Sequence, residues 1–164
     1  MSISDVIRNE YNNYNVIKAM QNSIKEDEIT KFRGEYFFLS NFYDTAILFK
    51  GQIYQNAESA FQSAKCENKI DRMWFMNLSG KEAKRLGKKI ELREDWEEVK
   101  EDIMYRVVYE KFRQNTYLKK KLLKTGDTEI CEENFWGDTE WGVCNGVGQN
   151  KLGKILMKVR EELR

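Results

Sequence analysis

The sequence predicts an α+β fold, a predominantly helical single domain with a small sheet. Apolar residues recur at helical spacing through most of the range 57–160, as in amphipathic helices that pack on a core. Residues 32–54 are instead rich in aromatic and β-branched side chains, with Asn, Asp and Gly as turn formers. The chain of 164 residues has no proline, no repeat and no linker-like stretch. We therefore expect one domain over 30–164, preceded by a helical extension over 1–29.

The first third of the chain contains one helical and one extended segment. Residues 4–28 carry apolar side chains at roughly helical spacing and end in a charged run, which predicts a helix. Residues 32–54 predict two or three short strands, with FKGQIY (49–54) as a hairpin. Asn56 is a favourable N-cap for a helix over 57–66.

The rest of the chain is mainly helical. The longest helix is predicted at about 94–114, and a final amphipathic helix begins near residue 150. The long helix has a core face made of Trp96, Val99, Ile103 and Val107. Other elements are predicted as short helices at 70–78, 80–89 and 116–124 and a strand at 128–131. A loop rich in Gly and Trp, 134–148, precedes the final helix.

The chain has no histidine, and this absence excludes several classes of enzyme. Ser-His-Asp triads, Cys-His pairs and zinc sites with histidine ligands are impossible, so acid–base work falls to carboxylates, lysines, tyrosines or cysteines. The formal net charge is +1, which gives no general expectation of nucleic-acid binding. Three cysteines without a CxxC pattern and the lack of a membrane-length apolar run predict a cytoplasmic protein with reduced thiols.

Glu58 is the first candidate for chemistry. It lies in the first turn of the predicted helix 57–66, where the positive end of the helix favours a carboxylate. Gln62 and Lys65 follow it on the same face at i+4 and i+7. An ordinary solvated helix face would give the same pattern, so both interpretations stay open.

The loop 134–148 is the second candidate. Trp136-Gly137 and Trp141-Gly142 flank Asp138, so the loop combines flat stacking surfaces, a carboxylate and glycines that allow close backbone approach. A loop that tucks two tryptophans into the core is the alternative. The surrounding range 127–140 holds six acidic residues and no basic one, and this excess could raise the pKa of one carboxylate and keep it protonated.

Two further segments carry weaker signals. In FRGEYFFLSNFY (32–43), Arg33 could clamp a phosphate, and Ser40 and Asn41 could hydrogen-bond a sugar or base between the rings of Phe38 and Phe42. A strand would equally explain Phe37 and Leu39 as core residues.

The segment 148–154 matches the first seven positions of a P-loop, but Ile155 stands where Ser or Thr should bind Mg²⁺, which excludes an NTPase. The glycines at 146 and 148 still place a helix start where a phosphate could bind. The basic stretch 81–93 could touch a polyanion or form a solvated helix face.

Four blocks of sequence occur in the order found in one protein family. They are FRGEYFFLSNFY (32–43), YQNAESAFQSAK (54–65), REDWEEVKEDIMYRVVYEKF (93–112) and FWGD…GVGQNKLGKILMKVR (135–160). Together they resemble the NADAR family, also called YbiA-like. The resemblance implies that 30–164 is an α+β domain that hydrolyses N-glycosidic bonds of ribosyl compounds.

The resemblance implies two substrate groups, phosphoribosylated intermediates of riboflavin synthesis and ADP-ribose attached to guanine in nucleosides or DNA. By motif position, Glu58, Trp96, Trp136 and Asp138 look like active-site residues of the family. Two positions depart from its pattern: Ser59 stands where histidine is frequent, and Asn56 where Thr or Ser after Pro is frequent.

These signals give one hypothesis for the site. An N-glycosidic bond breaks through an oxocarbenium-like sugar that a carboxylate can stabilise. We assign Glu58 or Asp138 as base and electrostatic stabiliser, with Lys65 as an alternative nucleophile that would form a Schiff base. The predicted substrate-binding residues are Arg33, Gly34, Ser40, Asn41, Phe42, Gln62, Trp96, Trp136, Gly137, Gly148 and Asn150.

The predicted partner is a ribosyl or ADP-ribosyl nucleotide, with ADP-ribosylated DNA as one form, and no membrane. We expect hydrolysis without a metal or cofactor. The main alternative is a non-catalytic module that binds ADP-ribose or another NAD-derived nucleotide. A third possibility is an interaction protein that uses the N-terminal helix as a docking surface.

Overall fold

The computed structural model describes residues 12–13, 15–16 and 28–164. Residues 12–13 and 15–16 are helical and exposed. The rest of the helix predicted at 4–28 lies outside the described residues, apart from Glu28. The described domain is mainly helical with small sheets, which confirms the predicted fold class.

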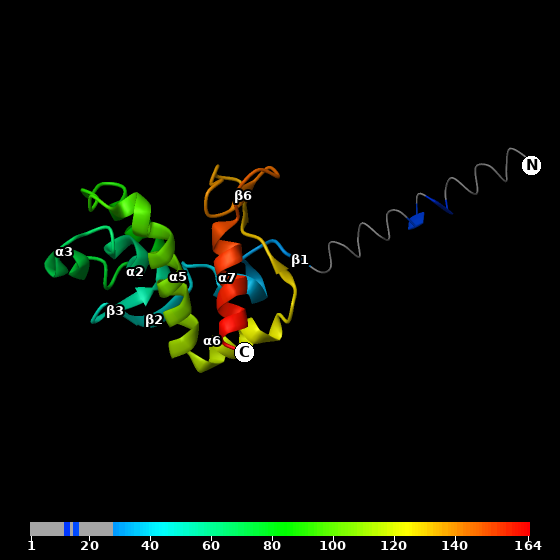
Figure 1. Ribbon diagram of the computed structural model, residues 1–164, viewed down its shortest axis with the longest axis horizontal. Coiled ribbons are helices and arrows are strands. Elements are labelled where there is room, and N and C mark those ends of the chain that lie inside the picture. Colours follow the sequence, from blue (N-terminus) through cyan, green and yellow to red (C-terminus); the bar gives the residue numbers. More distant parts are fainter. Residues whose placement is uncertain (1–11, 14, 17–27) are drawn as a thin grey trace, which may run out of the picture.

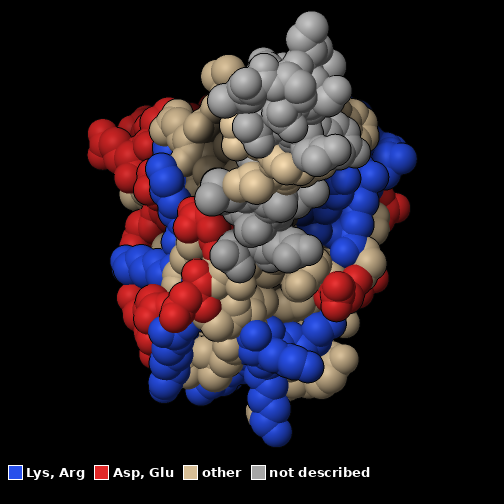
Figure 2. All heavy atoms as spheres, turned by 90° about the vertical axis from the view of Figure 1, so that its right-hand side faces the viewer, with Lys and Arg blue, Asp and Glu red and all other residues tan. Residues whose placement is uncertain are grey.

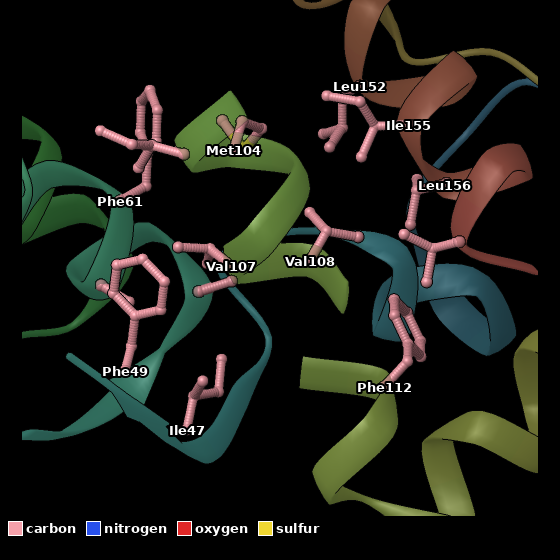
Figure 3. Packing of buried hydrophobic residues seen from close by; sticks show 14 of the residues in the cluster. Ile47, Phe49, Phe61, Met104, Val107, Val108, Phe112, Leu152, Ile155 and Leu156 are labelled. Atoms are coloured by element: carbon pink, nitrogen blue, oxygen red, sulfur yellow. The ribbon is translucent and has the colours of Figure 1, made fainter. Parts of the chain in front are cut away.

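Helix α5 (Trp96–Gln114) runs through the middle of the domain (Figure 1). One side of it packs against Ile47, Phe49 and Phe61, and the other side against helix α7 (Lys151–Glu162) (Figure 3). Its predicted apolar face is confirmed, because Trp96, Ile103 and Val107 are buried. Within 28–164, the other α-helices are α2 (Ala57–Ser63), α3 (Lys69–Met73), α4 (Gly80–Gly87) and α6 (Thr116–Lys124).

The predicted hairpin at 49–54 is confirmed. Strands β2 (Asp44–Phe49) and β3 (Gln52–Asn56) pair antiparallel, with Phe49 opposite Gln52. The two turn residues both have positive φ, 49° at Lys50 and 77° at Gly51. This is the type I′ geometry, whose twist matches the twist of the flanking strands.

The expectation of a strand through residues 34–39 is wrong. Gly34–Leu39 forms a 3-10 helix, η1. A strand would have put Phe37 and Leu39 on one face, whereas the helix buries the adjacent Phe38 and Leu39 and leaves Phe37 41% exposed. Aromatic composition alone does not distinguish a strand from a short helical turn.

Two short parallel pairings complete the sheets. Strand β1 (Glu28–Ile29) pairs with β4 (Glu129–Ile130), which confirms the strand predicted near 128–131. Glu28 and Ile29, which the sequence prediction places in the N-terminal extension, therefore contact the domain. Strand β5 (Glu133–Asn134) pairs with β6 (Val143–Cys144) and closes the loop between them.

The surface carries both signs of charge. In Figure 2, basic and acidic side chains are interspersed on the visible part of one face, in keeping with the formal net charge of +1. Among the residues that the structure describes, no helix has both the length and the apolar character needed to cross a membrane.

Candidate active site

A cavity of about 570 Å³ lies where α2, α4 and the first half of α5 meet the loop 132–141. Most of the predicted site residues line it. These are Ser40, Asn41, Phe42, Glu58, Gln62, Lys65, Trp96, Trp136, Gly137 and Asp138. Chain segments that lie up to about a hundred residues apart in sequence are thus brought to one place.

Glu58 lies on the helix side of this cavity. Helix α2 begins where the sequence predicts, because the Asn56 side chain accepts a hydrogen bond from the Ser59 amide at 2.8 Å. Every residue of α2 is buried, so the interpretation of an ordinary solvated face is wrong. Gln62 Nε2 donates to Glu58 Oε1 at 2.8 Å. Burial raises the pKa of Glu58, while the bond from Gln62 and the charges of Lys84 and Lys65 oppose the rise.

The segment 40–42 forms the floor beside Glu58. The Glu58 amide donates to Asn41 O at 2.9 Å, and Asn41 Nδ2 lies 3.2 Å from Met104 Sδ. Within the described residues, two buried side-chain oxygens of cavity-lining residues have no hydrogen-bond donor, Asn41 Oδ1 and Gln62 Oε1, and the latter lies against Gly87 of α4. Leaving such an atom unpaired costs free energy, so Asn41 Oδ1 is suited to accept a hydrogen bond from a ligand.

A buried lysine supports this segment from below. Lys111 of α5 is 1% exposed and its Nζ donates to Ser40 O at 2.8 Å. Burial lowers the pKa of Lys111 to about 7. The backbone that carries Ser40 and Asn41 is therefore attached to the central helix by one buried hydrogen bond.

The loop side of the cavity is held by hydrogen bonds. Asp138 Oδ1 accepts the backbone N–H groups of Glu140 at 3.1 Å and Trp141 at 2.9 Å. The Asn134 side chain donates to Asp138 O at 2.7 Å and accepts from the Asp138 amide at 3.1 Å. The loop thus fixes the position of the Asp138 carboxylate through its own backbone.

The two tryptophans of this loop have different roles. Trp141 is half-buried and packs edge-on against Phe61, with ring centroids 5.4 Å apart. Trp136 is 54% exposed and lies at the cavity. The interpretation of both rings as core residues is therefore wrong for Trp136, which presents a stacking surface to the cavity.

Two lysines approach the carboxylates. Lys65 Nζ donates to Gly87 O at 3.2 Å and lies 5.6 Å from the Trp96 ring centroid, and burial lowers the pKa of this lysine. Lys84 was not among the predicted site residues. Its Nζ lies 6.0 Å from the ring centroids of both Phe42 and Trp136. The sequence signal for Lys84 was the basic stretch 81–93, which gave no reason to single out one position.

Glu132 is the second functional candidate that sequence reasoning did not name. It lines the cavity with Glu58 and Asp138. Burial raises the pKa of Glu132 to about 7, and the charges of Asp138 and Glu58 add to the rise while Lys84 opposes it. The acidic excess over 127–140 had indicated that one carboxylate would hold its proton, without showing which one.

Arg33 lies in an adjoining cavity of about 310 Å³. This second cavity shares Ser40, Glu132 and Trp136 with the first. The Arg33 guanidinium is 5.7 Å from the Phe135 ring centroid. A cation suited to a phosphate therefore lies in a cavity that shares Glu132 and Trp136 with the main one.

Besides Arg33, three predicted substrate-binding residues do not line the main cavity: Gly34, Gly148 and Asn150. Gly34 begins η1 with a φ of 56°. A Cβ at Gly148 would lie 2.2 Å from Gly142 O, so this glycine allows two loop segments to pack closely. The Asn150 side chain donates to Ile130 O at 2.9 Å and accepts from the Glu132 amide at 3.0 Å.

The start of α7 does not offer its backbone donors to a phosphate. The N–H groups of Lys151 and Leu152 donate to the carbonyls of Glu140 and Trp141, at 3.3 and 2.9 Å. The expectation that the glycine-rich entrance of this helix holds a phosphate is corrected by these bonds, because the loop already uses the donors.

The two departures from the family pattern lie away from the cavity. The Ser59 hydroxyl and the Asn56 side-chain amide both donate to Leu78 O, at 2.8 and 3.0 Å. In the described part of the chain, no group of three or more Cys, Asp or Glu side chains is placed to hold a metal ion.

Comparisons with known proteins agree with this picture. The model of the NADAR domain family matches residues 28–164. The chain is 34% identical over 160 residues to a riboflavin biosynthesis protein of Vibrio vulnificus. This match covers 92% of the chain but only 42% of that protein's length. The chain is 33% identical over 150 residues to the N-glycosidase YbiA of Escherichia coli, covering 85% of this chain and 91% of that protein. The NMR structure of E. coli YbiA superposes with a TM-score of 0.73 at 31% identity, covering 83% of each chain.

Proposed function

The chain belongs to the NADAR domain family, and from this premise we propose that it is an N-glycosidase that hydrolyses the N-glycosidic bond of a ribosyl nucleotide. One observation carries the proposal. Glu58, Glu132 and Asp138 line a single cavity together with Trp96, Trp136 and three lysines. The E. coli relative is named an N-glycosidase, and this name supports the same class of reaction here.

Glu58 serves as the base and the electrostatic stabiliser. The sugar gains positive charge at its anomeric carbon as the bond to the base breaks, and a nearby carboxylate stabilises that charge. Gln62 orients the carboxylate through its 2.8 Å hydrogen bond. The same carboxylate then takes a proton from the water that adds to the anomeric carbon.

The aromatic and cationic residues position the substrate. Trp136 offers a half-exposed ring on which the base can stack. Arg33 in the adjoining cavity, which Trp136 also lines, suits a phosphate of the same substrate. Asn41 Oδ1 accepts a hydrogen bond from a sugar hydroxyl or a base N–H group.

Two substrates fit this arrangement. One is a phosphoribosylated aminopyrimidine of the kind formed early in riboflavin synthesis, which the name of the Vibrio relative favours. The other is ADP-ribose attached to guanine, as a nucleoside or in DNA. Both combine an N-riboside, a flat base and at least one phosphate, which are the three features that the cavities address.

Lys65 offers a second chemical route in the same cavity. Burial lowers the pKa of its ammonium group, and the neutral amine is the nucleophilic form. The amine would attack the anomeric carbon, the base would leave, and ring opening would give an imine that water hydrolyses to the free sugar. Borohydride added during turnover would reduce this imine to a stable adduct on Lys65, whereas direct attack by water leaves the protein mass unchanged.

The proposal is tested with a panel of N-ribosides and mass spectrometry of the products. The purified protein is incubated with a phosphoribosylated aminopyrimidine and with ADP-ribosylated guanosine, and thermal unfolding is measured with and without ADP-ribose. Release of the free base by the wild type, and its loss in Glu58→Gln, supports the N-glycosidase. Thermal stabilisation without release indicates a binding module. Neither stabilisation nor release indicates an interaction protein, and both of these outcomes overturn the proposal.

A further inference from the structure

Three of the carboxylates that line the cavity, those of Glu58, Asp138 and Glu132, differ in their hydrogen bonds. Glu58 accepts one hydrogen bond from Gln62. Asp138 accepts two from the backbone of its own loop. The Glu132 carboxylate has no hydrogen-bond donor and no ion-pair partner within the described part of the chain. A donor favours the charged form of a carboxylate, so Glu132 is the one of these three whose charged form no hydrogen bond stabilises.

The backbone of Glu132 is nevertheless held firmly on both sides. Its N–H donates to Asn150 Oδ1 at 3.0 Å, and its carbonyl accepts from the Val143 amide at 2.8 Å. Gly142 leaves room beside it, because a Cβ there would lie 3.3 Å from Glu132 Oε2 and 2.3 Å from Glu132 O. The loop thus presents an unpaired carboxyl group from a fixed position.

Glu132 also lies at the junction of the two cavities. It lines the main cavity with Glu58 and the adjoining one with Arg33, and Trp136 lines both as well. A base stacked on Trp136 would therefore have Glu132 close to its edge. The pKa of about 7 gives the carboxyl group a proton to donate near neutral pH.

We propose that Glu132 is the catalytic acid that donates a proton to the leaving base, while Glu58 acts as the catalytic base. This role of Glu132 rests on the proposed N-glycosidase function. As the bond between the anomeric carbon and nitrogen breaks, its electron pair goes to the nitrogen, which takes the proton of the Glu132 carboxyl group. Water adds to the anomeric carbon and gives its proton to Glu58. That proton returns to Glu132 through solvent, so the net reaction consumes one water.

The role is tested by changing how much the leaving group needs a proton. In a phosphoribosylated aminopyrimidine, the aminopyrimidine is a poor leaving group unless it is protonated. Nicotinamide mononucleotide, in contrast, releases nicotinamide as a neutral molecule that needs no proton. For Glu132→Gln we expect kcat/KM to fall by roughly 10²- to 10³-fold on the first substrate and by less than about fivefold on the second. Glu129→Gln, at an exposed position of β4, is the matched control and keeps wild-type rates on both.

The pH profile gives a second, independent measurement. The wild type should lose kcat/KM on the aminopyrimidine substrate as the pH rises through about 7, because the acid must be protonated. Glu132→Gln should lack this alkaline decline. The role of Glu132 would be overturned if Glu132→Gln lost kcat/KM equally on both substrates or kept the alkaline decline. It would also be overturned if Glu58→Gln, instead of Glu132→Gln, showed the dependence on the leaving group. A wild type that cleaves neither substrate would overturn the proposed function itself, and this role with it.

Discussion

The cavity has two walls that hold their polar groups by different means. We call them the helix wall (residues 57–63) and the loop wall (residues 132–141). All residues of the helix wall are buried, and its carboxylate is oriented by a neighbour one turn away on the same helix. The loop wall is largely exposed or half-buried. It is fixed by hydrogen bonds that the Asn134 side chain donates to the backbone and that the Asp138 carboxylate accepts from it.

The difference teaches how the site divides its chemistry. Packing of a buried helix leaves little freedom, which suits a carboxylate that must be held in one position. A loop held by hydrogen bonds can present an exposed ring and an unpaired carboxyl group to a substrate that enters from solvent. Variants in each wall should therefore fail in different ways.

Removing the charge of the helix wall should have the largest effect. Glu58→Gln keeps the shape of the side chain but removes the carboxylate, so we expect kcat to fall by roughly 10³-fold. The melting temperature should stay the same or rise, because a buried charge is costly. Product release and thermal unfolding measure the two effects, and wild-type turnover in this variant would show that the helix wall does not perform the chemistry.

Removing the ring of the loop wall should weaken binding more than turnover. Trp136→Ala takes away a stacking surface worth about 1–3 kcal/mol, so KM should rise roughly tenfold to a hundredfold. Because Trp136 is 54% exposed, unfolding should change little. Trp74→Ala is the matched control, since this ring is 72% exposed and lies outside the cavity. Equal effects of the two variants would contradict a binding role for Trp136.

Packing of the helix wall is tested at Gly87 of α4. A Cβ at this position would lie 1.9 Å from Gln62 Oε1, so Gly87→Ala must displace Gln62 or separate α2 from α4. We expect a loss of about 2–3 kcal/mol in the free energy of unfolding, together with lower kcat, because Gln62 orients Glu58. Lys81→Ala on the exposed face of α4 serves as control. Unchanged stability and turnover would mean that the two helices are not packed in this way.

Hydrogen bonding of the loop wall is tested at Asn134. Asn134→Ala removes the bonds that its side chain makes to Asp138 and Val143 and should cost about 1–2 kcal/mol of unfolding free energy. The rate should fall through a higher KM, because the loop that carries Trp136 loses its fixed shape. Gln149→Ala, exposed at the end of the same loop, should behave as wild type. A variant that loses kcat alone would argue that Asn134 acts in some other way.

The segment 40–42 between the two walls should show the smallest effect, through pH. The pKa of Lys111 is about 7 in the folded protein and that of lysine near 10.4 when unfolded, so the unfolded chain binds more protons between these values. Stability therefore rises with pH in this range. Between about pH 7.5 and 8.5, the free energy of unfolding measured in urea should rise by about 1 kcal/mol more for the wild type than for Lys111→Met. For the exposed control Lys120→Met, we expect the plot of unfolding free energy against pH to run parallel to that of the wild type. A parallel plot for Lys111→Met as well would contradict the shifted pKa.

The elements that the sequence predicts well are those with local signals. Asn56 caps α2, Lys50-Gly51 turns the hairpin, and apolar periodicity marks α5. Each signal depends on residues within a few positions of one another. The segment 34–39 was misjudged because its aromatic residues fit a strand and a 3-10 helix equally well in composition.

The site is harder to predict because it depends on contacts between distant segments. The polar face of α2 reads as solvated until the loop 132–141 is placed over it. Glu132 and Lys84 were missed for the same reason, since each belongs to a charged run whose members differ only in the fold. Asn150 and Gly148 were expected at the substrate, whereas the loop uses both for its own packing and hydrogen bonds.

The most direct test of the central claim follows the oxygen of water during turnover. The wild-type protein is incubated in H₂¹⁸O with the phosphoribosylated aminopyrimidine or with ADP-ribosylated guanosine, and borohydride is added at once to fix the released sugar as its alcohol. Attack at the anomeric carbon predicts label in the sugar product and an unlabelled free base by mass spectrometry, with no release by Glu58→Gln. Label in the base, or intact ribosides with the wild type, would contradict the claim.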